Sequence, residues 1–301
     1  RKQKKKKKKM LNETSSGWIW LMAWFAINIG VTLMNKSFFV WDAFKFPITL
    51  SMIHMIFSCI GSTLVLKTGN YATQQLTLRE QVPVILFSVL FCANIVVGNL
   101  ALKFVAVSLV QVVRSIIPGV TMALSMLLLG RTYERAYYWV VALIVFGVAL
   151  ASAGEVEFHV FGFVATVLVC FLSSTKSVMA QKFLVGKLKF HPFELLQRMS
   201  LLAALQMALL AYFIEYDYIR DWWRIKSEVA ADVGDNSAQT SFLVRLALNG
   251  VLAFFLNYTN FMTTKKTSAL TVTVAGNVKH MCTILFSVLM FRNPISIMNA
   301  C

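Results

Sequence analysis

Apolar segments long enough to cross a lipid bilayer follow one another along most of this chain. Hydrophobic residues make up 58% of its 301 residues and charged residues only 14%, whereas a soluble domain carries about a quarter charged residues. A helix needs about 20 apolar residues to span the hydrocarbon core. The sequence therefore predicts an all-α polytopic membrane protein and excludes a soluble protein with a single anchor.

The lengths of the apolar segments predict nine membrane helices. One longer linker, at about 215–240, is polar and of mixed charge, and the chain stops at Cys301, soon after Pro294 could start a tenth helix. The expected limits of the nine helices are 17–40, 47–66, 82–102, 106–129, 136–153, 158–182, 193–214, 242–262 and 268–291.

The basic residues outside the spans indicate the orientation of the chain. Cytosolic linkers of membrane proteins are enriched in lysine and arginine, and this bias predicts a cytosolic N-terminus. The lysine run at 1–16 is expected to be a disordered cytosolic tail that contacts anionic lipid. The net charge of +16 does not predict a nucleic-acid partner, because the excess lies in this tail and between the spans.

A weak internal repeat divides the membrane domain, residues 17–301, into two parts. The segment NKSFF…FKFPITL at 35–50 resembles TKSVM…LKFHPFELL at 175–196, and VSLVQVV at 107–113 resembles TSALTVT at 267–273. Five helices in each part is an odd number, so the second part must enter the membrane from the opposite side. The sequence thus predicts inverted halves of about 17–153 and 158–301, an arrangement typical of secondary transporters.

Basic residues inside the apolar segments are the main functional signal. Arg198 and Arg245 lie near helix starts, where their charged groups are expected to reach water. Each of the other four basic residues in the apolar segments costs about 2.5–3.5 kcal/mol at a helix centre. All thirteen acidic residues fall in linkers, tails or outer helical turns. The basic residues in or at the ends of spans are Lys36, Arg114, Lys176, Arg198, Arg245 and Lys279.

This absence of internal carboxylates favours one interpretation of the four deeper cations. A structural ion pair or a proton relay would need a buried acid. A water-filled cavity with positive walls, which suits an anionic ligand, is the remaining explanation. The alternative is that backbone carbonyls and polar side chains satisfy each cation separately.

Polar neighbours extend the candidate site along two of the spans. Gln111 and Pro118 share a helical face with Arg114, and Pro118 is expected to kink that helix near the cation. Asn277 lies two residues before Lys279. These residues are candidates to line the cavity, although close helix packing gives similar patterns.

The eighth predicted span adds an amide and an aromatic ring. Asn257 lies in a polar stripe, for which interhelical hydrogen bonds are the alternative explanation. Tyr258 is placed to stack on a base or a sugar, and ordinary packing is the alternative for this ring. Both residues are candidate ligand contacts.

Enzyme signatures are missing from the sequence. It has no glycine-rich phosphate loop, no HExxH motif and no nucleophile with a nearby base. The five cysteines have neither a disulfide framework nor metal-ligand spacing. We therefore expect a protein that is not an enzyme and that uses neither a cofactor nor a metal.

Three stretches carry a resemblance to a known family. NKSFF…FKFPITLSMIHM, VSLVQVVRSIIPG and KKTSALTVTVAGNVKHMCTILFSVLMFRNPIS resemble the triose-phosphate translocator family and its nucleotide-sugar transporter relatives, which belong to the drug/metabolite transporter superfamily. The resemblance implies ten helices in two inverted five-helix halves. It also implies exchange of phosphorylated solutes across organelle membranes.

The resemblance assigns roles to individual basic residues. Lys36 matches the family's first-helix lysine, Arg114 falls at a usual lysine position of the fourth helix, and Lys176 falls at a commonly basic position of the sixth. Lys279 matches the ninth-helix lysine that binds phosphate. The resemblance thus implies that these four residues line the substrate cavity.

Departures from the plastid pattern favour one branch of the family. Plastid members have arginine where this chain has His280, and histidine where it has Gln111. We therefore expect an antiporter in the Golgi or endoplasmic reticulum that exchanges a nucleotide sugar for nucleoside monophosphate. The alternatives are a sugar-phosphate/phosphate exchanger and a non-transporting degenerate paralogue. The oligomeric state, a homodimer included, stays open.

Overall fold

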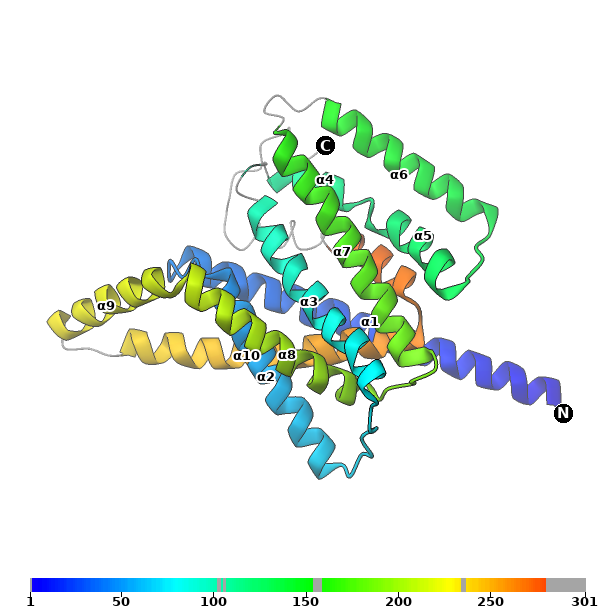
Figure 1. Cartoon of the computed structure of the whole chain (residues 1–301), viewed down its shortest axis with the longest axis horizontal. Coiled ribbons are helices and arrows are strands. Elements are labelled where there is room, and N and C mark those ends of the chain that lie inside the picture. Colours follow the sequence, from blue (N-terminus) through cyan, green and yellow to red (C-terminus); the bar gives the residue numbers. More distant parts are fainter. Residues whose placement is uncertain (1, 102–103, 105–106, 154–158, 234–236, 280–301) are drawn as a thin grey trace. The chain divides into compact units, whose positions relative to one another are not determined.

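The computed structural model describes residues 2–101, 104, 107–153, 159–233 and 237–279 (Figure 1). The regular elements of this part of the chain are all helices, which confirms the predicted class. In order they are α1 (Lys2–Val40), α2 (Pro47–Thr68), α3 (Leu78–Ala101), α4 (Val107–Arg114), α5 (Ile117–Leu129), α6 (Arg135–Ala153), α7 (Val160–Val185), α8 (Pro192–Ile214), α9 (Tyr216–Val233) and α10 (Ser237–Lys266). A further helical segment covers 269–279.

Seven helical segments within the described residues are long and apolar enough to span a membrane. An eighth apolar stretch, Arg135–Val148 in α6, is shorter. The predicted limits agree with the observed helices to within a few residues in most cases. The predicted helix 268–291 is described only as far as residue 279, and the start of a tenth helix lies outside the described residues.

Two segments differ from the prediction. The lysine-rich segment expected to be disordered has a helical backbone, which continues into the first span as α1. The longer polar linker 215–240, for which no helix was predicted, contains the helix α9. Its apolar side chains Ile219 and Trp222 pack into a hydrophobic cluster, while ion pairs such as Arg224–Asp221 form on its exposed side.

The chain divides into two compact units. Unit 1 contains residues 1–25, 93–189 and 260–301, and unit 2 contains residues 26–92 and 190–259. Both units take segments from both halves predicted from the internal repeat.

In unit 1, α7 packs against both α4 and α5. The apolar contacts centre on a cluster made by α4, α6 and α7, which contains Leu109, Val110, Val113, Val148 and Cys170. Asn94 of α3 accepts a hydrogen bond from Ser173 of α7 at 3.1 Å. The helix α7 therefore contacts α3, α4 and α5 and contributes to the cluster that it shares with α6.

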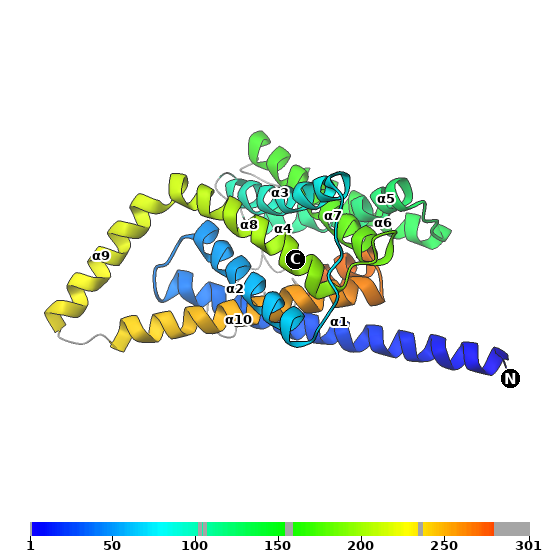
Figure 2. The same cartoon turned by 60° about the horizontal axis from the view of Figure 1, so that its bottom comes forward.

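In unit 2, α2 packs along α8 (Figure 2), and the side-chain amide of Gln197 donates a hydrogen bond to the Thr63 hydroxyl at 2.9 Å. The helices α2 and α10 also approach closely, since a Cβ added at Gly61 would lie 2.8 Å from the Phe254 ring. Glycine is therefore needed at position 61 for this close approach.

A carboxylate from a distant segment caps the start of α2. The backbone N–H groups of Ile48 and Thr49 donate to Glu215 at 3.0 and 2.8 Å, and the Thr49 hydroxyl donates at 2.7 Å. The first N–H groups of a helix have no partner within the helix. Glu215, which lies between α8 and α9, thus fixes the start of α2 in unit 2.

Candidate anion-binding site

A break in the fourth predicted span places Arg114 at a helix end. The helix α4 ends at Arg114 and α5 begins at Ile117, with Pro118 in the first turn of α5. Proline has no N–H, so it cannot donate to the carbonyl of Arg114, four residues earlier. The predicted kink is confirmed, and it occurs directly after the cation.

Side chains of two other segments satisfy backbone carbonyls around this break. Cys170 of α7 donates to the carbonyl of Val113 at 3.5 Å, and Ser174 of α7 donates to that of Ile117 at 3.2 Å. The Asn277 amide donates to the carbonyl of Ser115 at 3.1 Å. Because buried carbonyls need partners, these three bonds hold the break in place.

The helix that carries Lys279 is anchored at both ends of its described part. At its start, Gln181 of α7 accepts a hydrogen bond from the N–H of Ala269 at 3.0 Å, and the Ser268 hydroxyl accepts one from the N–H of Thr271 at 3.0 Å, as an N-cap residue does. Near its other end, Asn277 bonds the break after Arg114. Lys279 is thereby positioned relative to both α7 and the α4–α5 break.

Three half-buried cations meet in this part of unit 1. The charges of Arg114 and Lys176 both act on the ammonium group of Lys279, and the charge of Arg114 acts on Lys176. Like charges in a medium of low dielectric constant repel strongly. Among the described residues, no carboxylate forms an ion pair with Arg114 or Lys279, and the buried Nε of Arg114 has no hydrogen-bond partner. We call Arg114, Lys176 and Lys279 the cation cluster.

A glycine of α3 that was not predicted as a site residue makes room for the cation cluster. A Cβ added at Gly98 would lie 3.2 Å from Nη2 of Arg114, closer than ordinary contact. The available signal was an isolated glycine within an apolar helix, which often marks a close approach. Gly98 therefore belongs to the candidate site as a residue that permits the position of the guanidinium.

Other predicted site residues lie in unit 2. Lys36 is in α1, while Asn257 and Tyr258 are in α10. Asn257 donates to the Ser58 hydroxyl at 3.0 Å, an interhelical bond of the kind named as its alternative role. The ring of Tyr258 stacks on the ring of Phe193 with centroids 4.1 Å apart, a packing contact of the kind named as its alternative role. A ligand contact for these residues stays a prediction.

Two predicted site residues are described only in part or not at all. Gln111 lies in α4, one turn before Arg114, but its side chain is outside the described part of the structure. His280 is also outside the described residues. Their proposed contacts with a ligand stay predictions.

The two cations expected to reach water are instead paired with carboxylates. Arg245 forms a bidentate pair with Asp42, with both N–O distances 2.9 Å. Arg198 pairs at 3.0 Å with Glu194, one turn earlier in α8. Both arginine side chains remain partly exposed, 28% for Arg198 and 32% for Arg245, and the ion pairs at the helix ends were not predicted.

An all-helical chain with several apolar spans and with cations among them has the architecture of a polytopic membrane transporter. A solved crystal structure supports this fold, with a TM-score of 0.64 at 17% identity over 96% of this chain and 93% of that chain. The chain belongs to the Triose-phosphate Transporter family, whose model matches residues 17–301. The family resemblance seen in the sequence is thus confirmed.

Three relatives from Arabidopsis thaliana illustrate the range of the family. The GDP-mannose transporter GONST5 is 34% identical over 93% of this chain and 80% of its own length. UDP-galactose transporter 1 is 33% identical over 93% of this chain and 81% of its own length. A probable sugar phosphate/phosphate translocator is 34% identical over 92% of this chain and 75% of its own length.

Proposed function

We propose that this protein is an antiporter that exchanges a nucleotide sugar for nucleoside monophosphate across the membrane of the Golgi or the endoplasmic reticulum. Relatives named as GDP-mannose and UDP-galactose transporters support the nucleotide-sugar substrate. His280 and Gln111, which depart from the plastid pattern, support the same branch. The distribution of lysine and arginine between the linkers supports a cytosolic N-terminus.

The observation that carries the proposal is the cation cluster of unit 1. Three like charges act on one another, and the described residues provide no carboxylate to Arg114 or Lys279. Holding such groups together costs free energy unless an anion compensates them. The phosphate groups shared by a nucleotide sugar and a nucleoside monophosphate supply this compensation.

The proposed mechanism assigns phosphate binding to the cluster. Arg114 and Lys279 donate charge-assisted hydrogen bonds to phosphate oxygens, and Lys176 adds a third positive charge. Asn277 holds the α4–α5 break and so positions Arg114. An empty cluster leaves the charges uncompensated, so closing it without an anion is costly. This cost favours exchange over one-way transport.

A second candidate is exchange of a sugar phosphate for inorganic phosphate. It is favoured by the relative named as a probable sugar phosphate/phosphate translocator, which is as similar to this chain as the GDP-mannose transporter is. Both candidates use the phosphate site, and they differ in whether a nucleoside is recognised.

Thermal unfolding of the purified full chain with a panel of ligands separates the candidates. We expect GMP or UMP, present at 100 times the dissociation constant of the complex, to stabilise the protein by about 2.7 kcal/mol. The matching nucleosides without phosphate serve as controls and should give a much smaller shift. Stabilisation by inorganic phosphate or triose phosphate alone would support the second candidate, and no stabilisation by any of these ligands would contradict both.

A further inference from the structure

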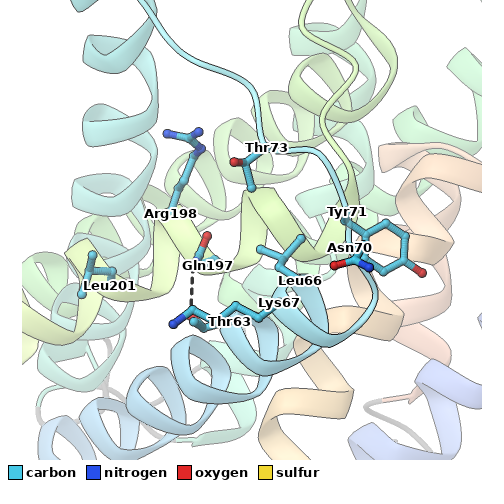
Figure 3. A pocket seen from close by; sticks show the side chains of 9 residues that line it. All are labelled: Thr63, Leu66, Lys67, Asn70, Tyr71, Thr73, Gln197, Arg198 and Leu201. Atoms are coloured by element: carbon cyan, nitrogen blue, oxygen red, sulfur yellow. Dashed lines mark hydrogen bonds between the residues drawn. The ribbon is translucent and has the colours of Figure 1, made fainter.

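Unit 2 contains a cavity that the proposed transport site does not use. It lies between the end of α2, the segment that follows it, and α8, and its volume is about 720 Å³ (Figure 3). This volume is within the range of about 300–1,000 Å³ typical of small-molecule sites. The cavity is lined by Thr63, Leu66, Lys67, Asn70, Tyr71, Thr73, Gln197, Arg198 and Leu201.

Arg198 is held in this cavity by a preformed set of hydrogen bonds. Its Nε and Nη2 donate to Oε1 of Glu194 at 3.3 and 3.0 Å, and Nη2 also donates to the carbonyl of Gln74 at 2.5 Å. Glu194 is only 1% exposed and also accepts from the N–H of Gln74 at 2.7 Å. These bonds leave Nη1, which has no hydrogen-bond partner among the described residues, for a ligand.

Lys67 adds a second cation from the opposite side of the cavity. It lies in the last turn of α2, its side chain is exposed, and no described carboxylate pairs with it. The buried Glu194 compensates Arg198 but not Lys67, so the three groups together carry one net positive charge. The hydrogen bond from Gln197 to Thr63, drawn in Figure 3, joins α8 to α2 at this cavity.

The depth of the cavity in the membrane follows from its position at the ends of two membrane-spanning helices. Lys67 is the last residue but one of the span Pro47–Thr68, and Arg198 is in the second turn of the span Pro192–Ile214. Residues at the ends of such spans lie near the lipid headgroups. A phosphate group that reaches this level belongs either to a lipid headgroup or to a dissolved phosphorylated solute.

We propose that this cavity is a second binding site, specific for a phosphate group. Nζ of Lys67 and Nη1 of Arg198 donate to the phosphate oxygens, because guanidinium and ammonium groups make strong charge-assisted hydrogen bonds to phosphate. The polar side chains of Asn70 and Thr73 line the same space. The site does not depend on whether the cation cluster transports anything.

The test is binding of two probes to the full-length chain in detergent, measured by native mass spectrometry. The lipid probe is phosphatidylinositol 4-phosphate, and the soluble probe is UMP. Lys67→Gln removes one charge-assisted contact, so we expect about tenfold weaker binding of the probe that uses the cavity. Lys182→Gln, which changes an exposed lysine in the last turn of α7, is the matched control and should bind as the unaltered protein does.

Which probe responds identifies the source of the phosphate. A loss confined to the lipid indicates a headgroup site, and a loss confined to UMP indicates a site for a dissolved solute. The Lys67-dependent binding should persist in a Lys279→Ala background, which separates this site from the cation cluster. Binding of both probes by Lys67→Gln at the level of the Lys182→Gln control would overturn the proposal.

Discussion

Replacing Lys279 with alanine is expected to weaken the stabilisation by phosphorylated ligands while leaving the empty protein as stable as before, or more stable. Hydrogen bonds to charged groups contribute about 1.5–3 kcal/mol each, so affinity should fall about tenfold or more. In the empty protein, Lys279 repels Arg114 and Lys176, so its removal relieves repulsion. Thermal unfolding of the purified chain, with and without ligand, measures both effects.

These two opposite effects distinguish a ligand site from a structural one. If Lys279 were satisfied by the protein itself, Lys279→Ala would lower the stability of the empty protein and leave the ligand shift unchanged. Lys182→Ala, at the exposed end of α7, is the control and should change neither quantity. A destabilised variant with a normal ligand shift would contradict the role proposed for Lys279.

Replacing Asp42 with alanine is expected to lower the free energy of unfolding by about 3 kcal/mol. Removing one partner of a buried ion pair typically costs about 3–5 kcal/mol, and the lower end applies here because the side chain of Arg245 is 32% exposed and that of Asp42 8%. The carbonyl of Asp42 also accepts a hydrogen bond from the Trp222 indole at 3.2 Å, but this backbone contact remains in the variant. Thermal unfolding in detergent measures the loss.

Two further variants control for this effect. Glu228→Gln removes the outer partner of the exposed pair with Arg224, at 3.9 Å, and should cost less than about 1 kcal/mol. Combining Asp42→Ala with Arg245→Met removes both charges and should recover part of the lost stability. A double variant that is no more stable than Asp42→Ala would show that the pair is not the source of the effect.

Much of the fold follows from patterns that are local in the sequence. Apolar lengths predict the membrane helices, and Pro118 predicts the break after Arg114. The pair Glu194–Arg198 has the i, i+4 spacing of a helical ion pair and was open to prediction. The helix α9 was missed because its charged residues concealed an apolar face, on which Ile219 and Trp222 lie.

The tertiary contacts could not be predicted in this way. Asp42 and Arg245 are 203 residues apart, and Glu215 caps α2 from 166 and 167 positions away. No local pattern links such residues, so a single sequence does not identify them as partners.

The candidate site was predictable in part. The cost of charge in a bilayer identified Arg114, Lys176 and Lys279, which lie near enough to one another in unit 1 for their charges to interact. The residues that hold them in place depend on packing and were not predicted in that role: Gln181 starts the helix of Lys279, and Gly98 makes room for Arg114. A positioning role of this kind becomes visible only when the neighbouring helices are known.

Uptake into reconstituted vesicles tests whether the cation cluster serves exchange of phosphorylated solutes. Vesicles that contain the full-length chain are loaded with nucleoside monophosphate or left without an exchangeable anion, and entry of a labelled nucleotide sugar is measured. We predict uptake only into the loaded vesicles, and none when Lys279→Ala replaces the unaltered protein. Equal uptake with and without the internal anion would contradict coupled exchange.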